Sequence, residues 1–125
     1  MRTNHVVEDK VWGKVTHLFQ SDYAAVSYLE VQAGFQCSRH IHYWRANQFS
    51  VVSGRIIVEE WVGGLLHSIN LNPGESYTVI SRIPHRFRVK ESGVVIEVYW
   101  PDRPDGKVLL DDIVRFNVGG VDDGS

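Results

Sequence analysis

The sequence has few of the features that would cross-link the chain or carry it into a membrane. Cys37 is the only cysteine among 125 residues, so an intramolecular disulfide is excluded. No apolar run approaches the ~20 residues that a membrane-spanning helix needs. The first residues also lack the apolar stretch of a secretion signal. We therefore expect a cytoplasmic protein that does not bind membranes.

An excess of charge of one sign is also missing. The 13 Lys and Arg residues are scattered among 15 Asp and Glu residues, and the formal net charge is -2. No basic face dense enough for a nucleic-acid backbone can be read, so we expect no nucleic-acid partner. A chain of this length with 43% hydrophobic residues fits one compact core, and we expect residues 1–125 to form a single domain.

Short alternating segments that end at glycine turns are the main structural signal. Residues 24–31 end at Ala33-Gly34, residues 48–52 end at Ser53-Gly54, and residues 55–62 end at Gly63-Gly64. Turn signals about every ten residues predict a small β-sandwich or barrel. The pattern predicts further strands over 65–70, 76–80, 87–89 and 94–100, a barrel core over about 11–100, a closing segment over 101–117, and a frayed tail over 118–125.

The segment His40-Ile41-His42 has the spacing of metal ligands. Successive side chains of a strand point to opposite faces, so the two imidazoles project the same way and can share one ion. His85, which follows Pro84, is a candidate third ligand, and the side-chain oxygen of Asn47 is a candidate fourth. Asn47 could equally form a turn, and Gln48 replaces it if the register slips by one residue. We expect a divalent ion such as Zn, Fe, Ni or Mn.

These residues also carry a family resemblance. Gly34 to His42, followed by Asn47 and Gly54, resembles the first motif of the cupins, and Gly74 to His85 resembles a shortened second motif. Within the cupins, the chain is most similar to the cupin domain of type II mannose-6-phosphate isomerases. The segments that suggest this are 11–14, 45–54, 95–98 and 111–116. The resemblance implies an all-β double-stranded β-helix (jelly-roll) barrel, a divalent metal inside it, and sugar-phosphate chemistry.

The metal-binding positions depart from the isomerase pattern. Those isomerases carry Gln, His and Glu where this chain has His40, His42 and Asn47. The exchange removes one formal negative charge and adds an imidazole, which shifts the preference toward softer transition metals.

The resemblance implies a metal-assisted aldose–ketose isomerase acting on a sugar or sugar phosphate. Glu97 is the first candidate for its general base, and Tyr43 and Glu59 are weaker ones, although the sequence leaves open which face of the 94–100 strand points inward. Tyr43, Trp44 and Arg45 could stack on a sugar or simply close the barrel. The alternatives are a non-catalytic sugar-binding or sensory cupin and a three-histidine metal oxygenase. An exposed sheet edge would favour a homodimer.

Overall fold

The computed structural model describes residues 1–103, 107–109 and 111–124. Residues 104–106 and 110 of the predicted closing segment, and Ser125 of the predicted tail, lie outside the described residues. The described part of the chain contains no helix, and therefore none long and apolar enough to cross a membrane. It forms eleven strands: β1 (Val6–Lys10), β2 (Gly13–Gln20), β3 (Ala25–Val31), β4 (Phe35–Gln36), β5 (His40–Ile41), β6 (Ala46–Val62), β7 (Leu65–Leu71), β8 (Ser76–Val79), β9 (His85–Trp100), β10 (Val114–Arg115) and β11 (Gly120–Val121).

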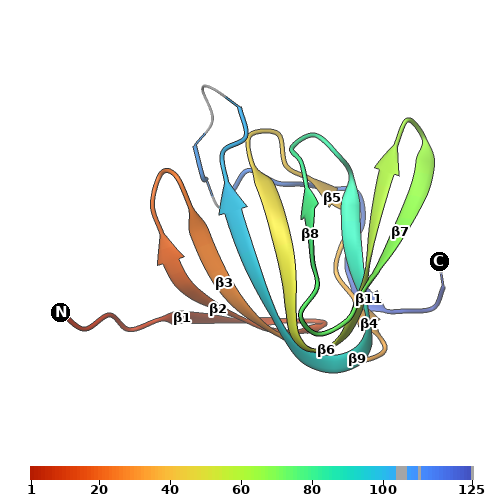
Figure 1. The fold of residues 1–125 in the computed structure, drawn as a ribbon, viewed down its shortest axis with the longest axis horizontal. Helices are drawn as coiled ribbons and strands as arrows, with labels where there is room; N and C mark the ends of the chain where they lie inside the picture. Colours follow the sequence, from red (N-terminus) through yellow and green to blue (C-terminus); the bar gives the residue numbers. More distant parts are fainter. Residues whose placement is uncertain (104–106, 110, 125) are drawn as a thin grey trace.

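The strands form one antiparallel sheet that curls around an interior (Figure 1). The long strands β6 and β9 pair along almost their whole length, from Ala46 with Trp100 to Glu60 with His85. Strands β3, β2 and β1 extend the sheet beyond the second half of β9, while β4 and β5 pair with its first half. Strands β7 and β8 pair with the two halves of β6. The prediction of a small all-β barrel is confirmed.

Two glycines let β6 and β9 bend where the sequence predicts that strands end. Gly54 has a φ of +78°, and a Cβ there would lie 2.5 Å from the carbonyl oxygen of Glu91. A Cβ on Gly93 would overlap the carbonyl oxygen of Ser53. The register of β6 against β9 shifts between Val51 and Ile56. The pairing therefore continues through a bulge instead of stopping, since glycine lets the two backbones approach.

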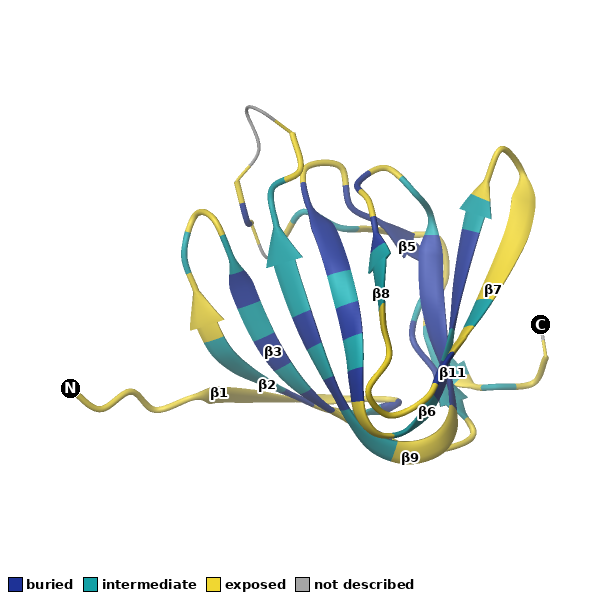
Figure 2. Cartoon of the chain, in the orientation of Figure 1, coloured by how far each residue is buried: buried dark blue, intermediate teal, exposed yellow. Residues whose placement is uncertain are grey.

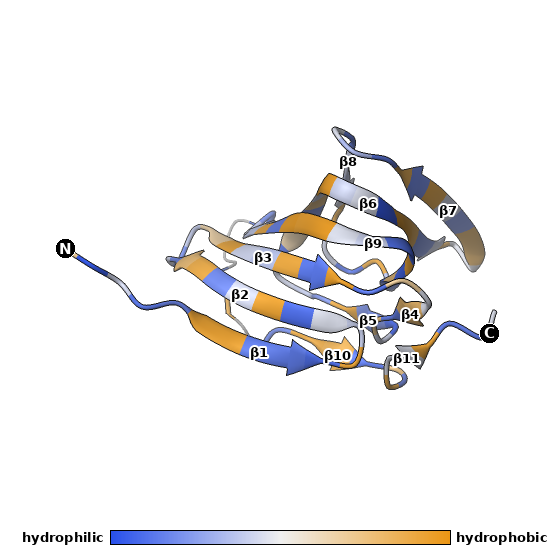
Figure 3. Cartoon of the chain, turned by 90° about the horizontal axis from the view of Figure 1, so that it is seen from below, coloured by the Kyte–Doolittle hydropathy of each residue, from blue (hydrophilic) through white to orange (hydrophobic). Residues whose placement is uncertain are grey.

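Apolar side chains on the concave face form the core. Burial alternates along β3 and along the first part of β6, residues 85–89 of β9 are all buried, and β1 and β7 are mostly exposed (Figure 2). The same alternation of apolar and polar residues is visible from below (Figure 3). Phe49, Val58, Phe87 and Val95 are almost fully buried, and the ring of Trp12 meets that of Phe87 edge to face at 5.0 Å. Each such side chain stabilises the fold by about 1.5–3 kcal/mol, so the core does not depend on a metal.

The C-terminal segment returns across the barrel. Strand β10 pairs with β5, and β11 pairs with β4. The side chain of Asn117 accepts a hydrogen bond from the backbone of Arg39 at 2.8 Å. Within the predicted tail, Asp122 has backbone and ionic contacts to residues far away in the sequence.

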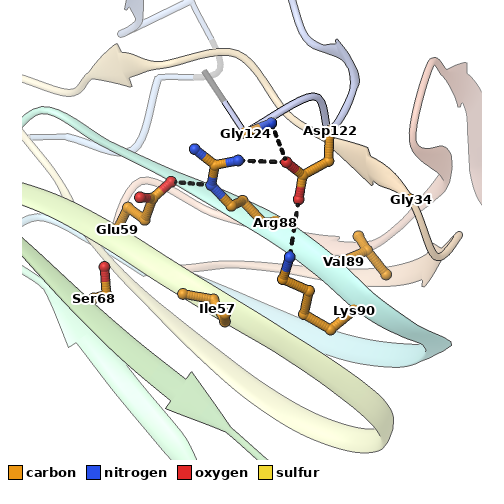
Figure 4. Close-up of a pocket in the computed structure, with 9 residues that line it drawn as sticks. All are labelled: Gly34, Ile57, Glu59, Ser68, Arg88, Val89, Lys90, Asp122 and Gly124. Atoms are coloured by element: carbon orange, nitrogen blue, oxygen red, sulfur yellow. Dashed lines mark hydrogen bonds and ion pairs between the residues drawn. The ribbon is translucent and has the colours of Figure 1, made fainter.

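Asp122 lies in a hollow of about 560 Å³ between the tail and the outer face of β6 and β9 (Figure 4). It pairs with Arg88 and, at 3.3 Å, with Lys90, and it accepts a hydrogen bond from the backbone of Gly124. Arg88 also donates to Glu59 at 2.5 Å. Burial alone would raise the pKa of Asp122, but the Gly124 hydrogen bond and the charges of Arg88 and Lys90 outweigh it and lower the pKa.

We expect Asp122→Asn to release the tail without unfolding the barrel. The ion pairs are lost and the core is untouched, so local stability falls by about 1–3 kcal/mol. The pKa of Asp122 in the folded protein lies below the ordinary value of a carboxyl group. The ion pairs therefore stabilise the tail fully at pH values above that ordinary pKa. This stabilisation is lost as the pH falls through the folded pKa. The protection of the amide groups of residues 118–124 against hydrogen exchange, relative to an unfolded chain at the same pH, should therefore fall in the variant at pH 7 and in the native protein in acid. Unchanged exchange in the variant would contradict this role.

Candidate metal centre

The fold brings together three histidines from two distant parts of the sequence. His40 in β5 pairs with His85 at the start of β9, and His42 follows β5 directly. The ring centroids lie 4.9 Å apart for His40 and His42, 4.5 Å for His40 and His85, and 5.1 Å for His42 and His85. All three side chains are buried, and their ligand atoms lie within 4.8 Å of one another.

Backbone carbonyl groups fix the orientation of every ring in the cluster. The Nδ1 atom of His40 lies 2.7 Å from the carbonyl oxygen of Ser38, that of His42 lies 2.7 Å from Asp112, and that of His85 lies 2.8 Å from Ile83. A carbonyl oxygen only accepts, so each Nδ1 carries the proton and each Nε2 keeps a free lone pair. Nε2 of His42 and of His85 is buried without a partner. Metal-ligating histidines have this arrangement.

Asp112 from the C-terminal segment serves the cluster twice. Its carbonyl oxygen accepts the bond from His42, while its carboxylate accepts bonds from the backbone of Tyr43 at 3.0 Å and of Trp44 at 2.9 Å. The turn after His42 is therefore fixed by a residue 70 positions later. A backbone acceptor carries no sequence signature, so this contact could not be predicted.

Burial keeps the three imidazoles uncharged. It is the main cause that lowers the pKa of His85 to about 4 and holds the pKa values of His40 and His42 well below their usual range. The positive charge of Arg45 lowers all three further. Neutral imidazole is the form that binds a cation, so the cluster needs no deprotonation at pH 7.

Asn47, and not Gln48, points into the barrel. Asn47 is completely buried, and its Nδ2 donates to Glu97 at 3.1 Å. Its Oδ1 is buried and has no partner. Gln48 is half-buried and bonds to Thr78 at 3.4 Å, as alternation along β6 requires. The free oxygen of Asn47 is therefore a further acceptor in the interior.

Glu97 and Tyr99 also face inward, which the sequence left open. Glu97 pairs with Phe49 across β6 and β9 and is buried. Burial raises its pKa, against opposing contacts from Tyr99, Arg45 and Asn47. The ring of Tyr99 meets that of His42 edge to face at 5.7 Å. The interior thus holds a carboxyl group close to the histidines.

The other candidates for a general base lie elsewhere. Tyr43 is 38% exposed, and its ring lies 5.6 Å from the guanidinium group of Arg82. Glu59 accepts hydrogen bonds from Arg86 at 2.8 Å and from Arg88. These pairs hold the two arginines in a buried network. The structure does not bring Tyr43 or Glu59 to the three histidines.

A cavity of about 470 Å³ reaches one member of the cluster. Its wall includes His40, Glu97, Tyr99 and Arg45, together with residues of β1 and of the segment that contains β10. The sequence left open whether Arg45 contacts a ligand or closes the barrel, and the structure places it in the wall of this cavity. The alternation of side chains along a strand could have indicated this position. Arg45 directly precedes β6 and lies two residues before Asn47, so the two side chains point to the same face.

No protein-family model and no curated protein sequence matches the chain. Solved structures do match. Oxalate decarboxylase from Bacillus subtilis aligns over 90% of this chain with a TM-score of 0.76 and 15% identity, and CapF from Staphylococcus aureus, a capsular polysaccharide assembling protein, aligns over 94% with 0.72 and 15%. KdgF from Halomonas sp. aligns over 81% with 0.67 and 19%. The alignment covers 30% of the oxalate decarboxylase chain, 35% of CapF and 90% of KdgF. The curled antiparallel sheet and these neighbours together show that the chain has the cupin fold.

Proposed function

We propose that the chain is a metal-dependent enzyme that isomerises a sugar or a sugar phosphate, with His40, His42, His85 and Asn47 as the metal ligands. The observation that carries the proposal is the set of buried acceptor atoms without partners: Nε2 of His42, Nε2 of His85 and Oδ1 of Asn47. Leaving buried polar atoms unpaired is costly, and a cation would satisfy all of them. Three imidazoles and one neutral oxygen suit Zn²⁺, Fe²⁺, Ni²⁺ or Mn²⁺ and leave a position for substrate.

The names of the fold neighbours are compatible with this proposal. One neighbour is described by its Mn(II) centres, and another assembles a capsular polysaccharide. The resemblance of residues 45–54 and 111–116 to type II mannose-6-phosphate isomerases points to the same substrate class. These likenesses support metal and carbohydrate chemistry, and the residues of the cavity suggest the reaction.

Glu97 would move the proton in an aldose–ketose isomerisation. When bound, a divalent ion supplies a Lewis acid that polarises the substrate carbonyl. The Glu97 carboxylate would take the proton from the hydroxyl-bearing carbon beside the carbonyl and return it to the former carbonyl carbon, while the proton of that hydroxyl group moves to the former carbonyl oxygen. The Asn47 amide holds one carboxylate oxygen at 3.1 Å, so the base is fixed beside the proposed ligands.

The test is a screen of metal-loaded protein, purified without a histidine tag, against aldoses, ketoses, their phosphates and sugar acids. Isomerisation in deuterated water should place deuterium on the carbon next to the carbonyl, observed by NMR. Sugar binding without turnover on the whole panel would refute the enzyme and favour a sugar-binding or sensory module. Metal-dependent oxygen uptake would favour the oxygenase alternative, which the three neutral imidazoles also suit.

Asn47 is expected to set the choice of metal. Asn47→Glu adds a charged, harder donor and should raise the affinity for Mn²⁺ relative to Zn²⁺, whereas Asn47→Ala should weaken binding of both by about tenfold or more. Thr78→Ala is the matched control, because it removes the partner of Gln48 on the outer face of the barrel. This variant should bind both metals as the native protein does. Competition titrations measure the selectivity. Identical selectivity in the native protein and both Asn47 variants would place Asn47 outside the ligand set.

We also propose a homodimer that forms through β1. Among the residues that the structure describes, this strand pairs only with β2 and its other edge is open, and Val6 and Val7 on it are 63% and 56% exposed. An open strand edge with apolar side chains is stabilised when a second copy covers it. A sedimentation experiment that finds only monomer at high protein concentration would contradict this assembly.

A further inference from the structure

Arg45 is a buried cation whose charge acts on the buried carboxyl group of Glu97. Arg45 is only 3% exposed, and its side chain lines the cavity that also reaches His40. Among the described residues it forms no ion pair. One nitrogen, Nη1, donates to the carbonyl oxygen of Leu109 at 2.5 Å, and Nε is buried without a partner. Burying an arginine in this way is unfavourable unless an anion completes its surroundings.

The guanidinium group is oriented toward the same space as the proposed metal ligands. It lies over the ring of Tyr99, with Cζ 4.0 Å from the ring centroid, and the other contact of that ring is His42 at 5.7 Å. The Tyr99 ring therefore contacts both the arginine and a member of the histidine cluster. With Nη1 bonded to Leu109, Nε is left without a partner inside the protein.

The charges around the cavity also call for an anion. On the proposed function, the ligands are three neutral imidazoles and an amide, so they cancel none of the charge of a divalent ion. The charged side chains that line the cavity balance one another, since Lys10, Arg45 and Arg115 are matched by Glu8, Asp9 and Glu97, so the charge of the ion itself remains uncompensated. Opposite charges in such a water-poor site attract strongly.

We infer that Arg45 binds a carboxylate of the substrate, so that the substrate is a sugar acid or a similar small hydroxy acid rather than a neutral sugar. This inference rests on the proposed function and narrows it to one substrate class. A carboxylate matches the planar edge of a guanidinium group through two parallel hydrogen bonds.

The test compares probes that differ in one group. Calorimetry on metal-loaded protein would measure the binding of glucuronate, of its neutral amide glucuronamide, and of glucose 6-phosphate. We expect glucuronate to bind about ten- to a hundredfold more tightly than glucuronamide, since hydrogen bonds between charged groups are lost with the amide. Equal binding of acid and amide, or tighter binding of the phosphate, would overturn the inference.

Variants of Arg45 test whether this residue causes the preference for glucuronate over glucuronamide. Arg45→Gln should reduce it to less than about threefold, and Arg45→Lys, which keeps the charge but not the fork, should retain part of it. Metal content and melting temperature, measured on each variant, show whether loss of the Leu109 contact alone has disturbed the fold. Arg55→Gln makes the same charge change at an outer site, where Arg55 pairs with Glu91, and should bind as the native protein does. Full preference in Arg45→Gln would overturn the assignment.

The outcomes separate this inference from the proposed function. Arg45-dependent binding of glucuronate without turnover of any sugar would refute the isomerase and leave the carboxylate site standing. Turnover of neutral sugars with no preference for acids would refute the carboxylate site and leave the isomerase standing.

Discussion

Replacing His42 with alanine is expected to abolish stoichiometric metal binding and leave the barrel folded. The variant removes one of three imidazoles whose Nδ1 protons are already bound to carbonyl groups, so the affinity should fall by more than a hundredfold. The apolar core around Phe49 and Phe87 is unchanged. Metal at a hundred times its Kd should stabilise the native protein by about 2.7 kcal/mol and the variant by almost nothing.

The measurement is elemental analysis of tag-free protein together with melting curves with and without metal. His67→Ala is the matched control, because His67 lies exposed on β7 away from the cluster. It should bind metal as the native protein does. Full metal retention in the His42 variant, or equal loss in the control, would show that the cluster is not the metal site.

Replacing Glu97 with glutamine is expected to reduce turnover about 10²- to 10⁴-fold with little change in substrate affinity. A general base acts mainly in the transition state, and glutamine keeps the size of the side chain but cannot take a proton. Deuterium incorporation should fall in parallel. Glu91→Gln, an exposed change on the same strand, provides the control. A kcat within about threefold of the native value would remove Glu97 from the proton-transfer step.

The sequence predicted the histidine cluster because strand alternation is a local property. His40 and His42 lie one residue apart near β5, and the motif pattern added His85, which the pairing of β5 with β9 places opposite His40. The register question between Asn47 and Gln48 could not be answered locally. Only the pairing of Asn47 with Tyr99 and Val79 decides which of the two faces inward.

Long-range contacts account for the features that the sequence did not reveal. The contacts of the tail include the pairing of Asp122 with Arg88, and the orientation of His42 depends on a carbonyl group of Asp112. Neither contact has a pattern within a short stretch of sequence. Gly54 was read as a strand end because a glycine that ends a strand and one that bends it look the same in sequence.

X-ray absorption spectroscopy of metal-loaded, tag-free protein tests the central claim most directly, since it reports the atoms bound to the ion. The account predicts three imidazole nitrogens at about 2.0–2.1 Å for zinc, with oxygen completing the shell. It also predicts that His40→Ala, His42→Ala and His85→Ala each remove this signature. A spectrum with one imidazole or none, or the same spectrum in the three variants, would contradict it.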